Sequence, residues 1–301
     1  MTMSQEISAR VVRISGGLCW ADAGSGGEPV QCLARGNVKK RSGGVMVGDQ
    51  VMITIADDGS GGVLEKVLPR RNQLVRPAVA NCDQAVVVSA VSEPAPNVAL
   101  IERILVQVLR EGLRACIVFT KCDMAPAAEY EDLVNIYRQA GFATIVTSAR
   151  TGQGVPQVRE ALDGLTSVFA GPSGAGKSAL LNAVHPGYGL IEGDVSERIG
   201  RGRHTTREVR LLRLDGGGYV ADSPGFSILD IDTMDLAELA AAYPDIAAYA
   251  PQCRFGGCLH QAEPDCAVKQ AVEDRAIGLA RYEHYITLLE ELRQALRDMY
   301  R

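Results

Sequence analysis

Between residues 84 and 170 the chain alternates short apolar runs with longer stretches in which apolar and polar positions follow a helical repeat. Four runs are apolar almost throughout, as expected of strands buried on both faces: QAVVVSAV (84–91), RACIVFT (114–120), FATIVTS (142–148) and LTSVFA (165–170). The intervening stretches have apolar residues three or four positions apart and predict helices at 96–112, 128–140 and 154–163. This alternation predicts βαβ units and a parallel sheet.

The two flanking segments have different patterns. Residues 1–70 contain short strand-like runs broken by glycine-rich turns, among them RVVRI, VQCLA and QVMITIA. About five such strands favour a small β-barrel, and both an OB-fold and an SH3-like barrel fit the pattern. Two further strands are predicted at 209–214 and 218–222, and residues 267–301 predict one or two charged amphipathic helices.

Composition adds that the chain is of the ordinary soluble globular class. Its 301 residues are 47% hydrophobic and 22% charged, and this length allows two or three domains. No apolar run is long enough for a membrane span and no signal peptide is evident, so we expect a cytoplasmic protein without a membrane partner. The net charge is −5, yet residues 1–76 carry ten Lys and Arg against seven Asp and Glu. This local basic excess is compatible with RNA contact.

The segment GPSGAGKS, Gly171 to Ser178, follows the last of the four apolar runs and opens a predicted helix. A GxxxxGK[ST] sequence between a strand and a helix is a specific signal for a phosphate-binding loop, or P-loop. Its backbone N–H groups face the β-phosphate, the ammonium of Lys177 reaches the β- and γ-phosphates, and the hydroxyl of Ser178 binds Mg²⁺. We expect nucleotide contacts, with Lys177 also acting in catalysis, from Gly171, Pro172, Ser173, Gly174, Ala175, Gly176, Lys177, Ser178 and Ala179.

The segment TKCD, Thr120 to Asp123, has the pattern of a guanine-reading loop. The carboxylate of Asp123 can accept hydrogen bonds from N1–H and the N2 amino group of guanine, and adenine offers neither. Lys121 is expected to pack along the ring plane, while Thr120 replaces the Asn of the usual NKxD motif and removes one amide. TSAR (147–150) ends the next strand and matches the backbone contact that completes a base pocket. The expected base contacts are Thr120, Lys121, Cys122, Asp123, Ser148 and Ala149.

The segment DSPG, Asp222 to Gly225, closes the strand 218–222 and supplies a third nucleotide motif. We expect Asp222 to hold Mg²⁺ through water and the N–H of Gly225 to sense the γ-phosphate. The guanine reader precedes the P-loop here, which reverses the order of an ordinary GTPase. Ligand loops of a parallel sheet meet at the carboxyl ends of its strands whatever their order along the chain, so the pattern predicts a circularly permuted GTPase domain.

Three of the eight cysteines cluster with a histidine as Cys253-x4-Cys258-x-His260-x5-Cys266. Three thiolates and one imidazole complete a tetrahedral shell and leave no open position for catalysis. The pattern therefore predicts one structural Zn²⁺. The other five cysteines are scattered along the chain and are expected to be small buried hydrophobic residues.

In their fixed order these motifs resemble those of the RsgA (YjeQ) family of ribosome small-subunit biogenesis GTPases. The resemblance rests on RGNVKK, VGDQV, PRRNQLVRP, TKCD, GPSGAGKS, GRHTT, DSPGF and the Cys/His cluster, and it covers residue 35 to the C-terminal helices. It implies a multidomain α/β protein with an N-terminal OB-fold β-barrel that binds RNA (1–76), a circularly permuted Ras-like P-loop GTPase domain (77–235) and a C-terminal α-helical zinc-binding domain (236–301). It also implies late maturation of the small subunit as the role, with the 30S ribosomal subunit and 16S rRNA as partners. We expect a monomer.

The motifs say least about which residues carry out GTP hydrolysis. Phe226 stands where Ras-like GTPases have the Gln that orients water, so we expect slow intrinsic turnover that the ribosome stimulates. In GRHTT, Thr205 or Thr206 is the candidate Mg²⁺ ligand and His204 the candidate for positioning water, unless it is simply an exposed loop residue. The alternative function is a zinc- and OB-containing RNA-binding nucleotide sensor with little hydrolysis. A P-loop kinase is a further alternative, but such an enzyme would not need the TKCD and TSAR segments.

Overall fold

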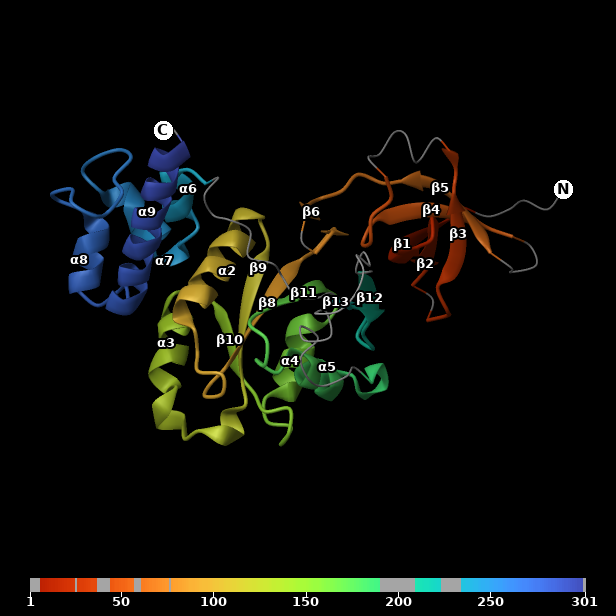
Figure 1. Cartoon of the computed structure of the whole chain (residues 1–301), viewed down its shortest axis with the longest axis horizontal. Coiled ribbons are helices and arrows are strands. Elements are labelled where there is room, and N and C mark those ends of the chain that lie inside the picture. The colour runs from red at the N-terminus through yellow and green to blue at the C-terminus, as the bar shows by residue number, and fades with distance from the viewer. Residues whose placement is uncertain are drawn as a thin grey trace.

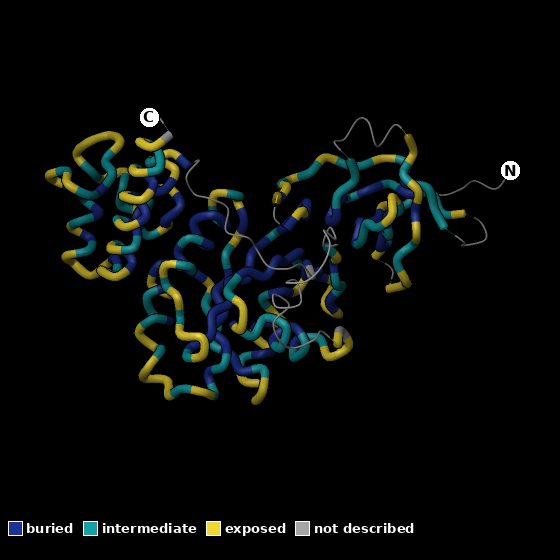
Figure 2. The backbone as a smooth tube through the Cα atoms, in the orientation of Figure 1, coloured by how far each residue is buried: buried dark blue, intermediate teal, exposed yellow. Residues whose placement is uncertain are grey.

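A computed structural model of the chain describes residues 6–24, 26–36, 44–56, 61–75, 77–189, 209–222 and 234–299. Three parts follow one another along the chain, and Figure 1 shows them as a β-barrel at the N-terminal end, a helix-covered central sheet, and a helical region at the C-terminal end. The most continuous buried backbone lies in the strands of the central sheet (Figure 2).

The barrel (residues 6–67) contains five strands: β1 (Glu6–Ser15), β2 (Leu18–Asp22), β3 (Val30–Ala34), β4 (Gln50–Ile55) and β5 (Gly62–Val67). They pair in the order β1-β2-β3-β5-β4, and a β1–β4 pairing closes the barrel. This five-stranded closure, with β3 parallel to β5, is that of an OB-fold rather than of an SH3-like barrel. Alternate side chains fill the interior, where Val11, Val51, Ile53 and Leu64 are fully buried.

The central sheet has the order β10-β9-β8-β11-β13-β12, and a short two-stranded ribbon, β6 with β7, connects it to the barrel. The strands are parallel except β12, which runs antiparallel to β13. The bounds are β6 (Gln73–Leu74), β7 (Val79–Ala80), β8 (Gln84–Ala90), β9 (Arg114–Thr120), β10 (Ala143–Val146), β11 (Thr166–Ala170), β12 (Arg210–Arg213) and β13 (Tyr219–Asp222).

Helices cover both faces of this sheet, because alternate residues of the apolar strands point to opposite sides. Ala85 and Val87 of β8 pack in the core that holds helices α2 and α3, whereas Val86 and Val88 pack with α4 and α5. The helices and turns are α2 (Val98–Arg110), η1 (Cys122–Met124), η2 (Ala127–Glu129), α3 (Glu131–Gln139), α4 (Val155–Leu162), α5 (Lys177–Val184) and η3 (Pro186–Tyr188).

The helical region (residues 234–299) has its own apolar core. It consists of α6 (Leu236–Ala241), α7 (Pro244–Tyr249), η6 (Ala250–Gln252), α8 (Ala267–Glu273) and α9 (Leu279–Met299). The side chain of Asp235 caps α6 and Glu238 returns a bond to the Asp235 backbone, a capping box that marks where this region begins. Tyr243, Ile246, Tyr285 and Leu289 are fully buried at the centre.

The barrel joins the central sheet edge to edge. Arg13 of β1 is the register partner of Arg210 of β12, so a single eleven-stranded sheet runs from β10 through to the barrel. Beside this pairing, the buried carboxylate of Asp22 accepts a 2.8 Å hydrogen bond from the hydroxyl of Tyr219 and lies 3.3 Å from the guanidinium of Arg213. We call these contacts the barrel joint.

The helical region joins the central sheet through helix α2. The Arg281 guanidinium of α9 donates to both carboxylate oxygens of Glu102 on α2, at 2.9 and 2.8 Å, and to Asp245 of α7 at 2.7 Å. Tyr243 and Phe142 place aromatic rings over it, with centroids 4.6 and 5.1 Å from the guanidinium carbon. We call this arrangement the helical joint.

These observations confirm the predicted fold class: an OB-fold barrel, a GTPase-type α/β sheet whose loops occur in permuted order, and a helical C-terminal part with a Cys/His cluster. Within the described ranges, none of the helices combines the length and apolarity needed to cross a bilayer.

Candidate nucleotide and metal sites

The P-loop leaves the carboxyl end of β11 in a conformation that only glycine tolerates at its first position. Gly171 has φ +142°, and a Cβ there would lie 2.1 Å from the carbonyl oxygen of Val88. Gly176, at φ +87°, is the left-handed N-cap of α5. The loop therefore wraps closely over β8. The first turn of α5, whose backbone N–H groups have no partner within the helix, faces the loop.

The side chain of Lys177 folds back over the P-loop. Its ammonium donates to the carbonyl oxygens of Gly171 and Pro172, at 2.9 and 2.7 Å. The lysine side chain is therefore bound to the first two residues of its own loop. Ser173 and Gly174 are exposed at the tip, while Ala175 is fully buried and Gly176, Ser178 and Ala179 are half-buried.

The TKCD loop leaves β9 at the same edge of the sheet. Lys121 adopts a left-handed conformation (φ +60°) and turns the chain into η1, which contains Cys122 and Asp123. The N–H of Cys122 donates to the carbonyl oxygen of Thr147 at 3.2 Å, so this loop is bound to the TSAR segment after β10. Ser148 is buried and Ala149 half-buried beside it.

The carboxylate of Asp123 is held ionised and oriented. The hydroxyl of Ser148 is the main cause that lowers its pKa, with contributions from the backbone and from Arg150. The guanidinium of Arg150 lies 2.7 Å from the carboxylate. Sequence reasoning did not assign Arg150, although its place within TSAR, next to the assigned Ser148 and Ala149, is a signal that could have found it.

The two loops are in direct contact. The hydroxyl of Thr120 donates a 2.5 Å hydrogen bond to the carbonyl oxygen of Ala175 in the P-loop. The ammonium of Lys121 donates to the carbonyl oxygen of Glu93, and a Cβ on Gly174 would lie 3.5 Å from Cδ of Pro94. The β8–α2 loop therefore borders both the P-loop and the TKCD loop. Sequence reasoning missed this contact, although the Pro-rich segment SEPAPN, directly after a parallel strand, was a signal for it.

Part of the expected site lies outside the described residues. These positions are His204, Thr205 and Thr206 of GRHTT, together with Gly225 and Phe226 of DSPGF. The backbone of Asp222 ends β13, the strand that pairs with β11, so Asp222 stands at the same edge of the sheet as the P-loop.

The Cys/His cluster has the dimensions of a zinc site. The four ligand atoms of Cys253, Cys258, His260 and Cys266 lie within 4.8 Å of one another. Nδ1 of His260 is 3.5 Å from the sulfurs of Cys253 and Cys266, which are 3.9 Å apart. Zn–S bonds of about 2.3 Å at a tetrahedral angle place two sulfurs roughly 3.8 Å apart, so the residues present fit Zn²⁺.

Hydrogen bonds from outside the cluster hold its loop in place. Tyr282 and Tyr285 of α9 donate to the carbonyl oxygens of His260 and Leu259, at 2.7 and 2.9 Å. Burial raises the pKa of Glu263, but bonds from several backbone N–H groups, among them that of Leu259, lower it to about 2. Such supporting contacts orient ligands before a metal binds.

Comparison with known proteins adds to this geometry. The family model described as RsgA GTPase matches residues 67–232. A relative from Moorella thermoacetica, named small ribosomal subunit biogenesis GTPase RsgA, is 44% identical over 282 residues, covering 94% of this chain and 96% of the relative. One of the same name from Caldanaerobacter subterraneus subsp. tengcongensis is 40% identical and covers 99% of each chain. This chain belongs to the RsgA GTPase family.

Solved structures of similar proteins agree with this membership. YjeQ from Thermotoga maritima superposes with a TM-score of 0.83 at 34% identity, covering 96% of this chain and 99% of that one. YloQ, described as a circularly permuted GTPase, gives a TM-score of 0.82 at 33% identity with 98% of each chain covered. Both likenesses extend across the barrel, the central sheet and the helical region.

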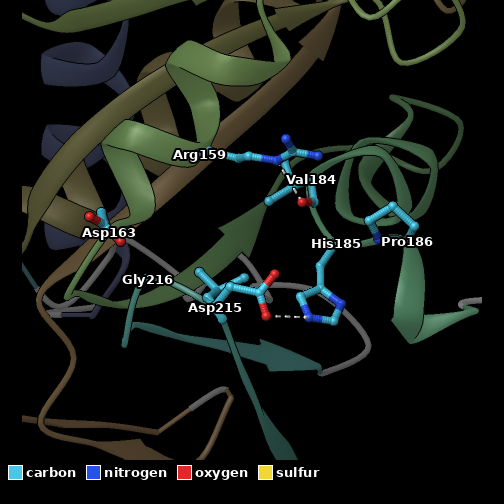
Figure 3. Close-up of a pocket in the computed structure, with 8 residues that line it drawn as sticks. Arg159, Asp163, Val184, His185, Pro186, Asp215 and Gly216 are labelled. Carbon is cyan, nitrogen blue, oxygen red and sulfur yellow. Dashed lines mark hydrogen bonds and ion pairs between the residues drawn. The ribbon is translucent and has the colours of Figure 1, made fainter.

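One cavity of this RsgA-family chain lies away from the nucleotide loops. It has a volume of about 220 Å³ and lies at the C-terminal end of α5, opposite the P-loop. Figure 3 shows Arg159 directed towards Val184, whose carbonyl oxygen accepts a 2.8 Å hydrogen bond, and His185 facing Asp215 at 3.3 Å. These contacts fasten the end of α5 to α4 and to the β12–β13 turn, so the cavity borders a structural junction.

Proposed function

We propose that this chain binds GTP with Mg²⁺, hydrolyses it to GDP and phosphate, and acts in late maturation of the small ribosomal subunit. The observation that carries the proposal is the meeting of the P-loop and the guanine-reading loop at one edge of the sheet, joined by the bond between Thr120 and Ala175. GTP has a guanine base at one end and its phosphates at the other, so it spans both loops.

The residue roles follow from this arrangement. The backbone of Gly171 to Ala179 and the ammonium of Lys177 hold the phosphates, and Gly225 senses the γ-phosphate. Asp123 reads guanine, with Thr120, Lys121, Cys122, Ser148 and Ala149 around it. Mg²⁺ is held by Ser178, Asp222 and either Thr205 or Thr206, and His204 positions the attacking water.

The proposed partner is the small ribosomal subunit with its 16S rRNA. The names of the relatives support this, and so does the local basic excess of residues 1–76. We infer three functional units, 1–76, 77–235 and 236–301, in a cytoplasmic monomer. Contact of the outer two units with rRNA brings about hydrolysis by the middle one.

The test is GTP hydrolysis by the full chain with and without purified small subunits. The wild type is expected to turn over slowly alone and faster with subunits. Lys177→Ala should lose nucleotide binding, whereas Lys269→Ala on α8 serves as the control for loss of one lysine. His204→Ala should keep GTP and subunit binding but lose the stimulation. A wild type that subunits do not stimulate would favour the alternative, an RNA-binding nucleotide sensor with little hydrolysis.

Guanine specificity is tested separately by competition between GTP and ATP. The wild type should prefer GTP, and Asp123→Asn should relax that preference because an amide cannot accept both hydrogen bonds from guanine. Equal binding of the two nucleotides by the wild type would contradict the assignment of TKCD.

We also propose that Cys253, Cys258, His260 and Cys266 hold one structural Zn²⁺. Metal analysis of the purified protein should find one equivalent, and Cys258→Ser should lower it. Cys116→Ser, at a buried cysteine of the central sheet, is the matched control and should leave the zinc content unchanged. Folded wild type without zinc would contradict the proposal.

A further inference from the structure

The carboxylate of Glu263 closes the zinc loop (residues 258–266) from the inside. Its oxygen Oε1 accepts a 2.9 Å hydrogen bond from the N–H of Leu259, and Oε2 accepts bonds of 2.9 and 3.1 Å from the N–H groups of Gln261 and Ala262. Three backbone donors within four residues therefore point at one side chain. Glu263 is not among the four residues whose ligand atoms cluster, so it acts on the loop and not on the metal directly.

These donors converge because of the backbone conformation of His260. Its φ is +60°, in the left-handed region, and the residue is 1% exposed. A left-handed residue within a turn directs successive N–H groups to one side, which forms a concave nest that binds anions. A residue with a side chain keeps this conformation only where its surroundings hold it there. Glu263 supplies the anion that this nest requires.

The same conformation directs the imidazole of His260 to the other ligands. Its Nδ1 lies 3.5 Å from the sulfurs of Cys253 and Cys266. The carbonyl oxygen of His260 is held separately, by a 2.7 Å bond from the hydroxyl of Tyr282. Tyr282 packs against the core of the helical region, so its loss would disturb that core as well. The three bonds to Glu263 lie within the loop, and a substitution there tests the loop itself.

We propose that Glu263 is a positioning residue of the zinc site, an inference that rests on the proposed Zn²⁺ ligands. By filling the nest, its carboxylate holds His260 in the left-handed conformation and keeps the imidazole directed at the cysteine sulfurs. The loop is thereby arranged before the metal binds, and the carboxylate sets how tightly the chain retains Zn²⁺. Groups that orient ligands in this way commonly change metal affinity by about 10- to 100-fold.

The experiment measures the dissociation constant of Zn²⁺ for the full chain by competition with a chromophoric chelator. Glu263→Gln can replace only one of the two acceptor oxygens, and Glu263→Ala removes both. The matched control is Asp265→Asn, which removes one negative charge from the same loop, at a side chain that is 63% exposed and pairs with Arg254. Glutamine should weaken zinc binding about tenfold and alanine about a hundredfold, whereas Asp265→Asn should stay within about twofold of wild type.

Cobalt in place of zinc gives a second measurement, because the visible absorption of Co²⁺ reports the geometry of its ligands. In Glu263→Gln the ligand-field bands should shift while the thiolate charge-transfer band remains, since the cysteines still bind and only the histidine is held less well. Unchanged bands would mean that the carboxylate does not position His260.

Two further results would overturn the proposal. Equal weakening by Glu263→Gln and Asp265→Asn would show that only the charge of the loop matters. An unchanged zinc affinity with a lower melting temperature would show a merely structural role. If alanine prevents folding, glutamine, which has nearly the shape of glutamate, carries the comparison with the control. A wild type that binds no zinc would instead overturn the proposed zinc site.

Discussion

The central sheet is joined to its two neighbours in opposite ways. At the barrel joint, strand β1 continues the sheet beyond β12, and the ion pair is only half buried: the side chain of Asp22 is 5% exposed, but that of Arg213 is 34% exposed. At the helical joint no strand crosses. A single guanidinium, Arg281, links α9 to Glu102, and both side chains are 1% exposed.

Because of this difference, we expect substitutions at the two joints to lower the free energy of unfolding by different amounts. Backbone pairing with part-exposed ion pairs weakens by degrees, because water and salt can replace each lost contact. A buried ion pair has no such replacement: burial raises the pKa of Glu102, and Arg281 is the main group that counters this, with smaller contributions from Tyr137, Tyr243 and His284. Removing one partner leaves a charge that nothing compensates.

Metal removal is expected to have the largest effect, and it acts on the helical region alone. Tyr285 belongs to the core of that region and donates to Leu259 in the zinc loop, so the loop supports the helix that carries Arg281. A chelator should lower the free energy of unfolding of this region by several kcal/mol, because metal binding and folding are coupled. Limited proteolysis should then cut after residue 234 first. Equal loss from the barrel would contradict the separation of the two joints.

Arg281→Met should have the next largest effect. It should lower the free energy of unfolding by denaturant by about 3–5 kcal/mol, because it leaves the carboxylates of Glu102 and Asp245 buried without their partner. The matched control is Arg103→Gln, which removes an exposed ion pair with Glu291 between the same two helices and should cost less than about 1 kcal/mol. Similar values for the two variants would show that burial does not distinguish these pairs.

Tyr219→Phe should cost about 1 kcal/mol, the net contribution of one hydrogen bond, since Asp22 keeps Arg213 as a partner. The effect should appear as a lower midpoint of urea unfolding without a change in slope. A loss as large as that of Arg281→Met would mean that the barrel joint also depends on a single buried group.

Arg213→Gln should have the smallest effect, about 0.5 kcal/mol at low salt, because its side chain is partly exposed and the attraction to Asp22 is screened. The difference from wild type should vanish as sodium chloride rises to 1 M. A difference that salt leaves unchanged would indicate that the arginine acts through its 2.9 Å hydrogen bond to the carbonyl oxygen of Gly24 or through packing of its stem.

Much of the fold could be predicted because its signals are local. The strand RACIVFT was predicted at 114–120 and is observed as Arg114–Thr120, since a continuous apolar run bounded by polar residues has few other uses. The P-loop could likewise be predicted from its glycines, because Gly171 needs a backbone conformation that other residues avoid. Strands β2 and β5 were not named in advance: β2 has only five residues, and β5 is only half apolar.

What could not be predicted depends on residues far apart in the chain. Arg281 and Glu102 are 179 positions apart, and neither lies in a motif, so only the folded structure brings them together. The departure at Thr120 suggested a weakened base reader. Its hydroxyl also donates to the carbonyl oxygen of Ala175, 55 positions later, a contact that no motif indicates.

The single register pair between β1 and β12 has a consequence for how the molecule can be divided. Strand β12 is the last strand of the central sheet, and its other neighbour is β13. Without the barrel, its N–H and C=O groups would form a free edge on which a second chain could add a strand. A shortened chain that begins after the barrel is therefore expected to self-associate more than the full chain does.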